Sequence, residues 1–188
     1  TPPGTLDDWS KPLDPMSQIV TTGAVVLSVE IPLARKIAAI AVAGWRPDGD
    51  IHVGLIEYLP VEQVLARQLE LAGKHTLHTI RRGPEPKAGK KDERRLLPAI
   101  IIDPTSPAGM LAEPLRKAGY DPVLMTTTEV AASCARLQDG LSAGTTWHRA
   151  SAAVDVAIEG AVRRDIGDGN WAFGRKKSAA ASVDVAPI

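Results

Sequence analysis

Short apolar runs separated by turn residues make up the first third of the chain. Residues 24–30 (AVVLSVE), 36–44 (KIAAIAVAG) and 51–57 (IHVGLIE) are such runs, and the last two are separated by a turn-like Arg-Pro-Asp-Gly-Asp segment. Runs of this length that are bounded by Gly, Pro and Asp are typical of β-strands. Three of them joined by short connections predict an antiparallel meander.

A change to helical spacing follows this meander. Residues 61–73 (VEQVLARQLELAG) repeat apolar side chains every three or four positions and end at a glycine, which predicts an amphipathic helix. Further along, the pattern predicts strands at 98–103 and 120–125 and helices at 110–118, 128–140 and 151–163. Thr126, Thr127 or Thr128 is the expected N-cap of the second of these helices. Strands first and β–α alternation later predict an α/β fold with a mixed sheet of about five or more strands and helices on both faces.

Two segments lie outside this pattern. Residues 1–17 contain four prolines and no apolar periodicity, so we expect residues 1–22 to be an N-terminal arm or linker and residues 23–188 to form one folded domain. Residues 74–97 hold eight Lys and Arg against three Asp and Glu, and they are interrupted by Gly83, Pro84 and Pro86. We expect this segment to be a mobile basic loop inserted into the domain.

Composition narrows the class of protein. The 188 residues are 44% hydrophobic and carry 22 Lys and Arg against 22 Asp and Glu, which indicates a folded domain without an overall positive field. The apolar runs are shorter than the roughly 20 residues that cross a bilayer, and no signal-peptide pattern is present, so neither a membrane span nor secretion is expected. The single cysteine, Cys134, has no disulfide partner and no Cys or His cluster around it, which favours a small core residue in a reducing compartment.

Two carboxylates end predicted strands. Glu30 closes the first apolar run and Asp103 closes the run at 98–103. If these strands are neighbours, the two carboxylates converge, and close like charges cost free energy unless a cation lies between them. Hard oxygen ligands select Mg²⁺ or Mn²⁺, and a pair of such ions about 4 Å apart supports phosphodiester cleavage. The alternative is that both residues merely end their strands and face water.

Several blocks of sequence occur in a characteristic order. After the strand that ends in Glu30 come AAIAVAG at 38–44, IIIDPTSPAG at 100–109, a helix at 152–162, WAFGRKK at 171–177 and SVDVAPI at 182–188. In their order and spacing these blocks resemble the nuclease domain of bacteriophage large terminase subunits, particularly those of phages that infect actinobacteria. The resemblance extends from residue 24 to the last residue.

This resemblance implies a ribonuclease H-like fold and a metal-dependent endonuclease that cleaves double-stranded DNA during phage genome packaging. Glu30, Asp103 and Asp184 then take the places of the three acidic residues that bind two Mg²⁺ or Mn²⁺ ions and form the catalytic site. The family usually has Asp where this chain has Glu30, and IPLARK at 31–36 lacks the usual Ser-Pro-Asp turn. A longer carboxylate shifts the metal geometry, so a catalytically impaired DNA- or protein-docking module is the alternative.

The resemblance also implies partners and a location. These are double-stranded DNA, the terminase ATPase domain, the small terminase subunit and the portal, in the cytoplasm of an infected or lysogenic bacterial host, with no membrane. DNA contact needs local positive charge, which either serves phosphate binding or only keeps a loop solvated. The candidate DNA-binding residues are Arg81, Arg82, Lys90, Lys91, Arg94, Arg95, Arg175, Lys176 and Lys177.

Other polar residues give weaker predictions. Asp155 is either a metal neighbour or part of an exposed helix face, and Asp165 and Asp168 are turn formers or substitute ligands. The four histidines lack metal-ligand spacing, and we expect them at the surface or at strand edges. A third function, a small-molecule phosphate site, would use the loop 104–109 and the N-terminus of the helix after it.

Overall fold

Six strands form the central sheet of the computed structural model, which describes residues 9–174. Their order is β7-β6-β1-β2-β3-β8. The bounds are β1 Val25–Glu30, β2 Ile37–Trp45, β3 Ile51–Pro60, β6 Ile100–Ile102, β7 Val123–Leu124 and β8 Thr146–Trp147. Strands β1, β2 and β3 form the predicted antiparallel meander. Strands β6 and β7 extend the sheet in parallel beyond β1, and β8 lies parallel to β3 at the opposite edge.

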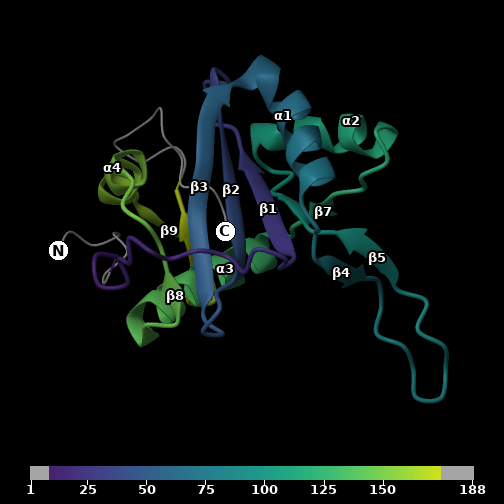
Figure 1. The fold of residues 1–188 in the computed structure, drawn as a ribbon. Coiled ribbons are helices and arrows are strands. Elements are labelled where there is room, and N and C mark those ends of the chain that lie inside the picture. The colour runs from purple at the N-terminus through teal and green to yellow at the C-terminus, as the bar shows by residue number, and fades with distance from the viewer. Residues whose placement is uncertain (1–8, 175–188) are drawn as a thin grey trace.

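Helices cover both faces of this sheet (Figure 1), which confirms the predicted α/β architecture. Helix α1 (Val61–Lys74), the short 3-10 helix η1 (Pro107–Leu111) and α2 (Ala112–Lys117) pack on one face. The other face is covered by α3 (Thr127–Ala143), α4 (Ala152–Gly160) and a hairpin of β9 (Arg163–Gly167) and β10 (Asn170–Phe173). None of the helices in the described part of the chain is both long and apolar enough to cross a membrane.

Alternation along β1 divides its side chains between two environments. Leu27 and Val29 are fully buried in the main core, where they pack with residues of β6, α1 and α2. Because successive strand residues point to opposite faces, Ser28 and Glu30 face away from this core. A second, smaller core around Leu137 and Leu141 of α3 packs on that opposite face.

Local signals account for the helix boundaries. Thr126 is the N-cap of α3, and its side chain forms a capping box with Glu129. Ser151 caps α4, which ends at Gly160, earlier than predicted, because the chain turns into β9. Pro114 is tolerated in α2 because it lies in the first turn, where its missing N–H has no helical partner.

The basic segment forms a hairpin where the sequence predicted a loop. Helix α1 continues to Lys74, and β4 (Thr79–Arg82) then pairs with β5 (Arg95–Pro98), so only residues 83–94 connect them as a loop. This hairpin projects beside the sheet (Figure 1). The two strands are short and rich in arginine, so their sequence lacks the apolar alternation that would predict a hairpin.

Residues 9–22 lie against one end of the sheet, where β2 ends, β3 begins and the chain leaves β8. Trp9 stacks on His148 with ring centroids 3.7 Å apart, and its indole N–H donates to Asp155. Leu13 forms a parallel β-bridge with His148. Ser17 is only 1% exposed. The arm is therefore tied to the residues that follow β8.

Candidate active site

The strands that carry the two candidate acids are neighbours. Strand β1 pairs in parallel with β6 in the register Leu27 to Ile100 and Ser28 to Ile101. Two residues further on, the same register places Glu30 beside Asp103 on the face opposite α1 and α2. Neighbouring strands lie about 4.8 Å apart, so the two carboxylates share one site at the carboxyl end of the sheet.

Both acids are buried. Glu30 is 1% exposed and Asp103 is 3% exposed, so the alternative in which they only end strands and face water is wrong. The Oδ1 atom of Asp103 accepts a hydrogen bond from the Thr105 backbone N–H at 2.9 Å and from the Thr105 hydroxyl at 2.7 Å. Thr105 therefore holds the Asp103 carboxylate in one orientation.

The loop after Asp103 is a tight turn. Ser106 donates from its hydroxyl to the Asp103 carbonyl at 3.0 Å and accepts from the Ala108 backbone N–H at 3.1 Å. A Cβ atom on Gly109 would lie 2.8 Å from the Pro104 carbonyl oxygen, so this close approach requires glycine. Ser106 thus caps a helix of only five residues, which argues against the anticipated phosphate site in this loop.

The sequence did not predict that Thr105 and Ser106 contact Asp103. The available signal was the Asp-Pro-Thr-Ser order itself, because Asp followed two residues later by a donor is the pattern of an Asx turn. The sequence did indicate a small-residue loop here, and the structure adds that the loop orients the acid.

Small side chains lie next to the acids on the same face. Glu30 pairs with Ala39 of β2, and Ala39 pairs with Tyr58 of β3, so these residues form one row across the sheet. Ser28, two residues before Glu30 on β1, pairs with Ala41. The Ser28 hydroxyl is buried and has no hydrogen-bond partner among the described residues. Both alanines are buried, and Tyr58 packs against them.

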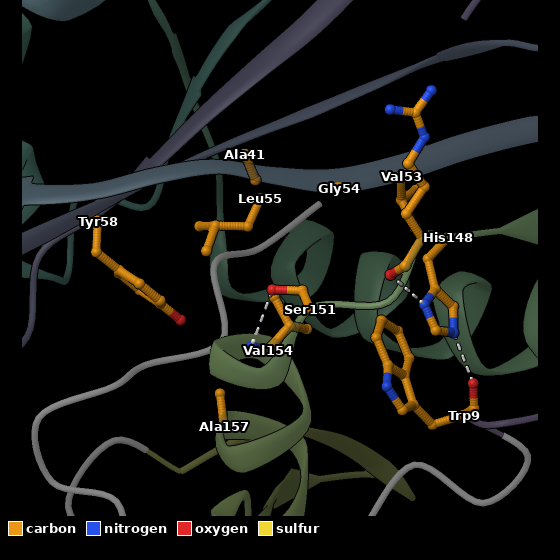
Figure 2. A pocket seen from close by; sticks show the side chains of 11 residues that line it. Trp9, Ala41, Val53, Gly54, Leu55, Tyr58, His148, Ser151, Val154 and Ala157 are labelled. Carbon is orange, nitrogen blue, oxygen red and sulfur yellow. Dashed lines mark hydrogen bonds between the residues drawn. The ribbon is translucent and has the colours of Figure 1, made fainter. Parts of the chain in front are cut away.

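A pocket opens on this face between β3 and α4 (Figure 2). Ala41, Leu55 and Tyr58 line it from the sheet, and Val154 and Ala157 line it from α4. Its lining is largely apolar and contains no carboxylate. Tyr58 belongs both to this pocket and to the row of Glu30 and Ala39, so the pocket adjoins that row.

The donor set suits a hard divalent cation. Two buried carboxylates with oxygen ligands are what Mg²⁺ and Mn²⁺ prefer, and a cation offsets the cost of placing like charges together. Among residues 9–174, no group of three or more His, Cys, Asp or Glu side chains is placed to hold a metal ion. The third expected ligand, Asp184, lies outside the described residues.

Comparisons with solved structures show which proteins share this fold. The large terminase of bacteriophage HK97 matches with a TM-score of 0.64 at 13% identity, covering 93% of this chain and 39% of that chain. The large terminase nuclease of the thermophilic phage G20c matches with a TM-score of 0.61 at 10% identity, covering 96% and 92%. Its structure with bound magnesium matches with a TM-score of 0.59 at 10% identity, covering 95% and 96%. The chain has the fold of a phage large terminase nuclease.

This terminase nuclease fold is ribonuclease H-like, as the sequence resemblance implied. The chain spans 39% of the HK97 terminase and nearly all of the G20c nuclease. No protein-family model and no curated protein matches the chain.

The secondary acidic candidates have structural roles in the terminase nuclease fold. Asp155 is half-buried and accepts from the Trp9 indole at 2.9 Å, so it is neither an exposed residue nor placed with the acids. Asp168 has a φ of 52° in the turn between β9 and β10, and Asp165 accepts from the Gly167 N–H at 2.8 Å. Asp168 lies in a turn, as predicted, whereas Asp165 lies in strand β9 and pairs with Trp171, so the turn prediction is wrong for Asp165.

Two histidines are buried, so their predicted surface positions are wrong. His52 is 9% exposed and lies with Nδ1 2.8 Å from the Ser17 hydroxyl. Burial, followed by the positive charges of Arg149 and Arg46, lowers the pKa of His52. His148 is 3% exposed, and its ring lies between the carbonyl oxygens of Trp9 and Arg149 (Figure 2). Cys134 is buried, as predicted.

Ion pairs hold most arginines of the hairpin. Arg81 pairs with Asp92, and Arg94 pairs with both Asp92 and Glu85. These contacts hold the pKa of Asp92 well below its usual range. Lys90 and Lys91 are exposed in the connecting loop and form no ion pair with another described residue. Arg175, Lys176 and Lys177 lie outside the described residues.

The other two hairpin arginines contact the body of the fold. Arg82 binds both carboxylate oxygens of Glu129, which lowers the pKa of Glu129 to about 2, and Arg95 pairs with Asp121. The hairpin begins beside Val25, where the His78 N–H donates to the Val25 carbonyl. Glu30 ends the same strand, so the base of the hairpin and the acids lie toward opposite ends of β1.

Proposed function

We propose that this chain is the nuclease domain of a phage large terminase and hydrolyses double-stranded DNA during genome packaging with the help of divalent metal ions. The observation that carries the proposal is the pair of buried carboxylates, Glu30 and Asp103, on adjacent parallel strands of a terminase nuclease fold. Two buried carboxylates on adjacent strands offer hard oxygen ligands to a divalent cation.

Glu30, Asp103 and Asp184 are the proposed ligands of two Mg²⁺ or Mn²⁺ ions. When bound, such ions supply Lewis-acid chemistry by activating a water nucleophile and neutralising charge on the phosphodiester. Thr105 orients Asp103 through two hydrogen bonds to Oδ1. Ala39 and Ala41 place small side chains beside the acids on the same face.

DNA binding rests on local charge, because the chain has no net charge. Lys90 and Lys91 on the exposed loop, together with Arg175, Lys176 and Lys177, are the cations with which we expect backbone phosphates to pair. Arg81, Arg82, Arg94 and Arg95 contribute through the hairpin that they stabilise. The ATPase domain, the small terminase subunit and the portal are the proposed partners, in the cytoplasm of the bacterial host.

A second function is favoured by Glu30 itself. Its carboxylate reaches one methylene further than the usual Asp, and only two acids meet among the described residues. Metal geometry tolerates deviations of only about 0.5 Å. The alternative proposal is therefore that the chain is a DNA- or protein-docking module with impaired catalysis.

Plasmid nicking tests the two functions against each other. Wild type, Asp103→Asn and Asp168→Asn are compared in Mg²⁺, in Mn²⁺ and in EDTA. Asp168→Asn is the matched control, because it makes the same chemical change in an exposed turn whose positive φ suits Asn. We expect metal-dependent nicking by wild type and Asp168→Asn, and none by Asp103→Asn. No nicking by wild type in any metal, with DNA binding retained, would identify the docking module.

A further inference from the structure

An open pocket lies beside the edge strand β7. Three arginines line it from three separate segments: Arg82 from β4, Arg95 from β5 and Arg116 from α2. Asp121 is the carboxylate of the lining, and the pocket measures about 440 Å³. This volume lies within the range of ligand sites, about 300–1,000 Å³.

Asp121 brings two of these arginines together. Its Oδ1 accepts from Arg116 Nε at 2.9 Å, and its Oδ2 accepts from Arg95. The hydrogen bond from Arg116, and after it the one from Arg95, lowers the pKa of Asp121. One ionised carboxylate therefore fixes two guanidinium groups that would otherwise repel each other.

The third arginine is held from outside the pocket. Arg82 donates to Glu129 at the start of α3 and to the Leu124 carbonyl, 3.4 Å away, at the open edge of the sheet. Glu129 does not line the pocket. Glu113 approaches both Arg116 and Lys117 on α2, so with Glu129 included four cations face three carboxylates and a positive charge remains.

Hydrogen-bond capacity also remains. Each guanidinium has about five N–H donors in a planar fork that matches the oxygens of a phosphate. Asp121 accepts one N–H from Arg95 and one from Arg116. The pocket thus combines residual positive charge, spare donors and a rigid carboxylate support, which is the chemistry of a phosphate site.

We propose that this pocket binds one phosphate group of the DNA backbone, an inference that rests on the proposed nuclease function. Leu124, which lines the pocket, pairs with Ile102, the residue before Asp103. From the strand spacing, the Leu124 backbone lies roughly 6 Å from that of Asp103. Because β7 is the edge strand, a DNA strand that passes round this edge can reach from the pocket to the opposite face, which carries the acids. Such a strand carries a phosphate about every 3.4 Å along its axis.

Neighbouring residues on α2 provide a matched test. Arg116→Gln and Lys117→Gln each remove one positive charge, and both side chains approach Glu113, at 3.8 Å and 3.9 Å. Only Arg116 lines the pocket. Binding of a 20-base-pair duplex is measured in EDTA across a salt series, so that cleavage plays no part.

We expect Arg116→Gln to weaken binding about tenfold and to reduce the slope of log affinity against log salt by about 1. Lys117→Gln should stay within about twofold of wild type. Equal affinities for the two variants would overturn the proposal.

A second variant separates phosphate binding from a merely structural ion-pair network. Asp121→Asn removes the negative charge that competes with a phosphate, so it should bind the duplex at least as tightly as wild type. Weaker binding by Asp121→Asn, with an unchanged melting temperature and unchanged Nε–H signals of Arg95 and Arg116, would contradict the pocket as a phosphate site.

NMR of the arginine side chains distinguishes a phosphate of the DNA backbone from a free phosphate ion. Inorganic phosphate and the duplex are each titrated into the chain, and the Nε–H signals of Arg95 and Arg116 are followed. Shifts with both ligands support the proposal, whereas shifts with inorganic phosphate alone would assign the pocket to a small anion and overturn it.

Failure of this inference is distinguishable from failure of the nuclease function. If wild type nicks DNA but Arg116→Gln and Lys117→Gln bind alike, only the pocket assignment fails. If wild type never nicks DNA but Arg116→Gln selectively weakens binding, the pocket stands and the nuclease function fails.

Discussion

The two ends of the central sheet hold buried polar groups of opposite character. At the carboxyl ends of β1 and β6, Glu30 and Asp103 place two acids of the same sign side by side. At the far end, Ser17 of the arm hydrogen-bonds to His52, and Arg46 donates to the Ser17 hydroxyl at 2.7 Å and to Asp14 at 2.9 Å.

Complementarity distinguishes these two clusters. Around Ser17 every interaction joins a donor to an acceptor or a positive to a negative group, so the cluster stabilises the fold. The two acids carry charge of the same sign, so a bound cation would favour their proximity. We therefore interpret the cluster around Ser17 as structural and propose the pair of acids as a cation site.

Changing the charge of Glu30 should have the largest effect. We expect Glu30→Gln to reduce metal-dependent cleavage by at least about 10³-fold, because losing one ligand removes several kcal/mol of transition-state stabilisation. Glu30→Asp keeps the charge and should retain cleavage to within about tenfold. Initial nicking rates measure both, and equal loss in the two variants would show that side-chain length rather than charge decides activity.

Ser17→Ala should lower the free energy of unfolding without changing the two acids. Ser17 is 1% exposed, and its removal leaves His52 and Arg46 each without one hydrogen-bond partner, which costs about 1–3 kcal/mol. Urea unfolding measures the change, and Ser10→Ala on the exposed part of the same arm is the control. A Ser17→Ala variant as stable as Ser10→Ala would show that the cluster around Ser17 does not stabilise the fold.

Thr105 connects the acids to the surrounding loop and should have an intermediate effect. Thr105→Val removes the 2.7 Å hydroxyl bond to Asp103 and keeps the side-chain shape. Partners that orient metal ligands are worth about 10–100-fold in activity, so we expect a loss of that size with stability nearly unchanged. Thr105→Ser restores the hydroxyl and should recover most of the rate, whereas failure of this rescue would assign Thr105 a packing role.

His52 should make the structural cluster sensitive to acid, with the smallest effect. Its pKa is lowered from 6.5 in the folded protein, so below that pH the unfolded chain binds a proton that the folded chain excludes. The free energy of unfolding should therefore fall as the pH drops below 6.5, by at most about 1.4 kcal/mol per pH unit from this group. His52→Gln removes this contribution, so its unfolding free energy should fall less steeply than that of wild type between pH 7.5 and 5.

Helices and strands with regular apolar spacing were predictable from the sequence. The meander of β1, β2 and β3, the helix after it and the capped start of α3 all follow from residues only a few positions apart. The β4–β5 hairpin was not predictable, because arginine ion pairs rather than apolar alternation hold it. His52 and His148 gave no sign of burial, since their partners Ser17 and Trp9 come from the distant arm.

The sequence by itself determined the strands and helices with regular apolar spacing, the acids that end two strands and the resemblance to terminase nucleases. Only the tertiary structure decided that β6 inserts next to β1, that Glu30 and Asp103 are therefore buried side by side, and that Arg82, Arg95 and Arg116 share a pocket. The reason is physical: helix and strand periodicity depends on neighbouring residues, whereas strand pairing and the meeting of charges depend on contacts between segments far apart in the chain.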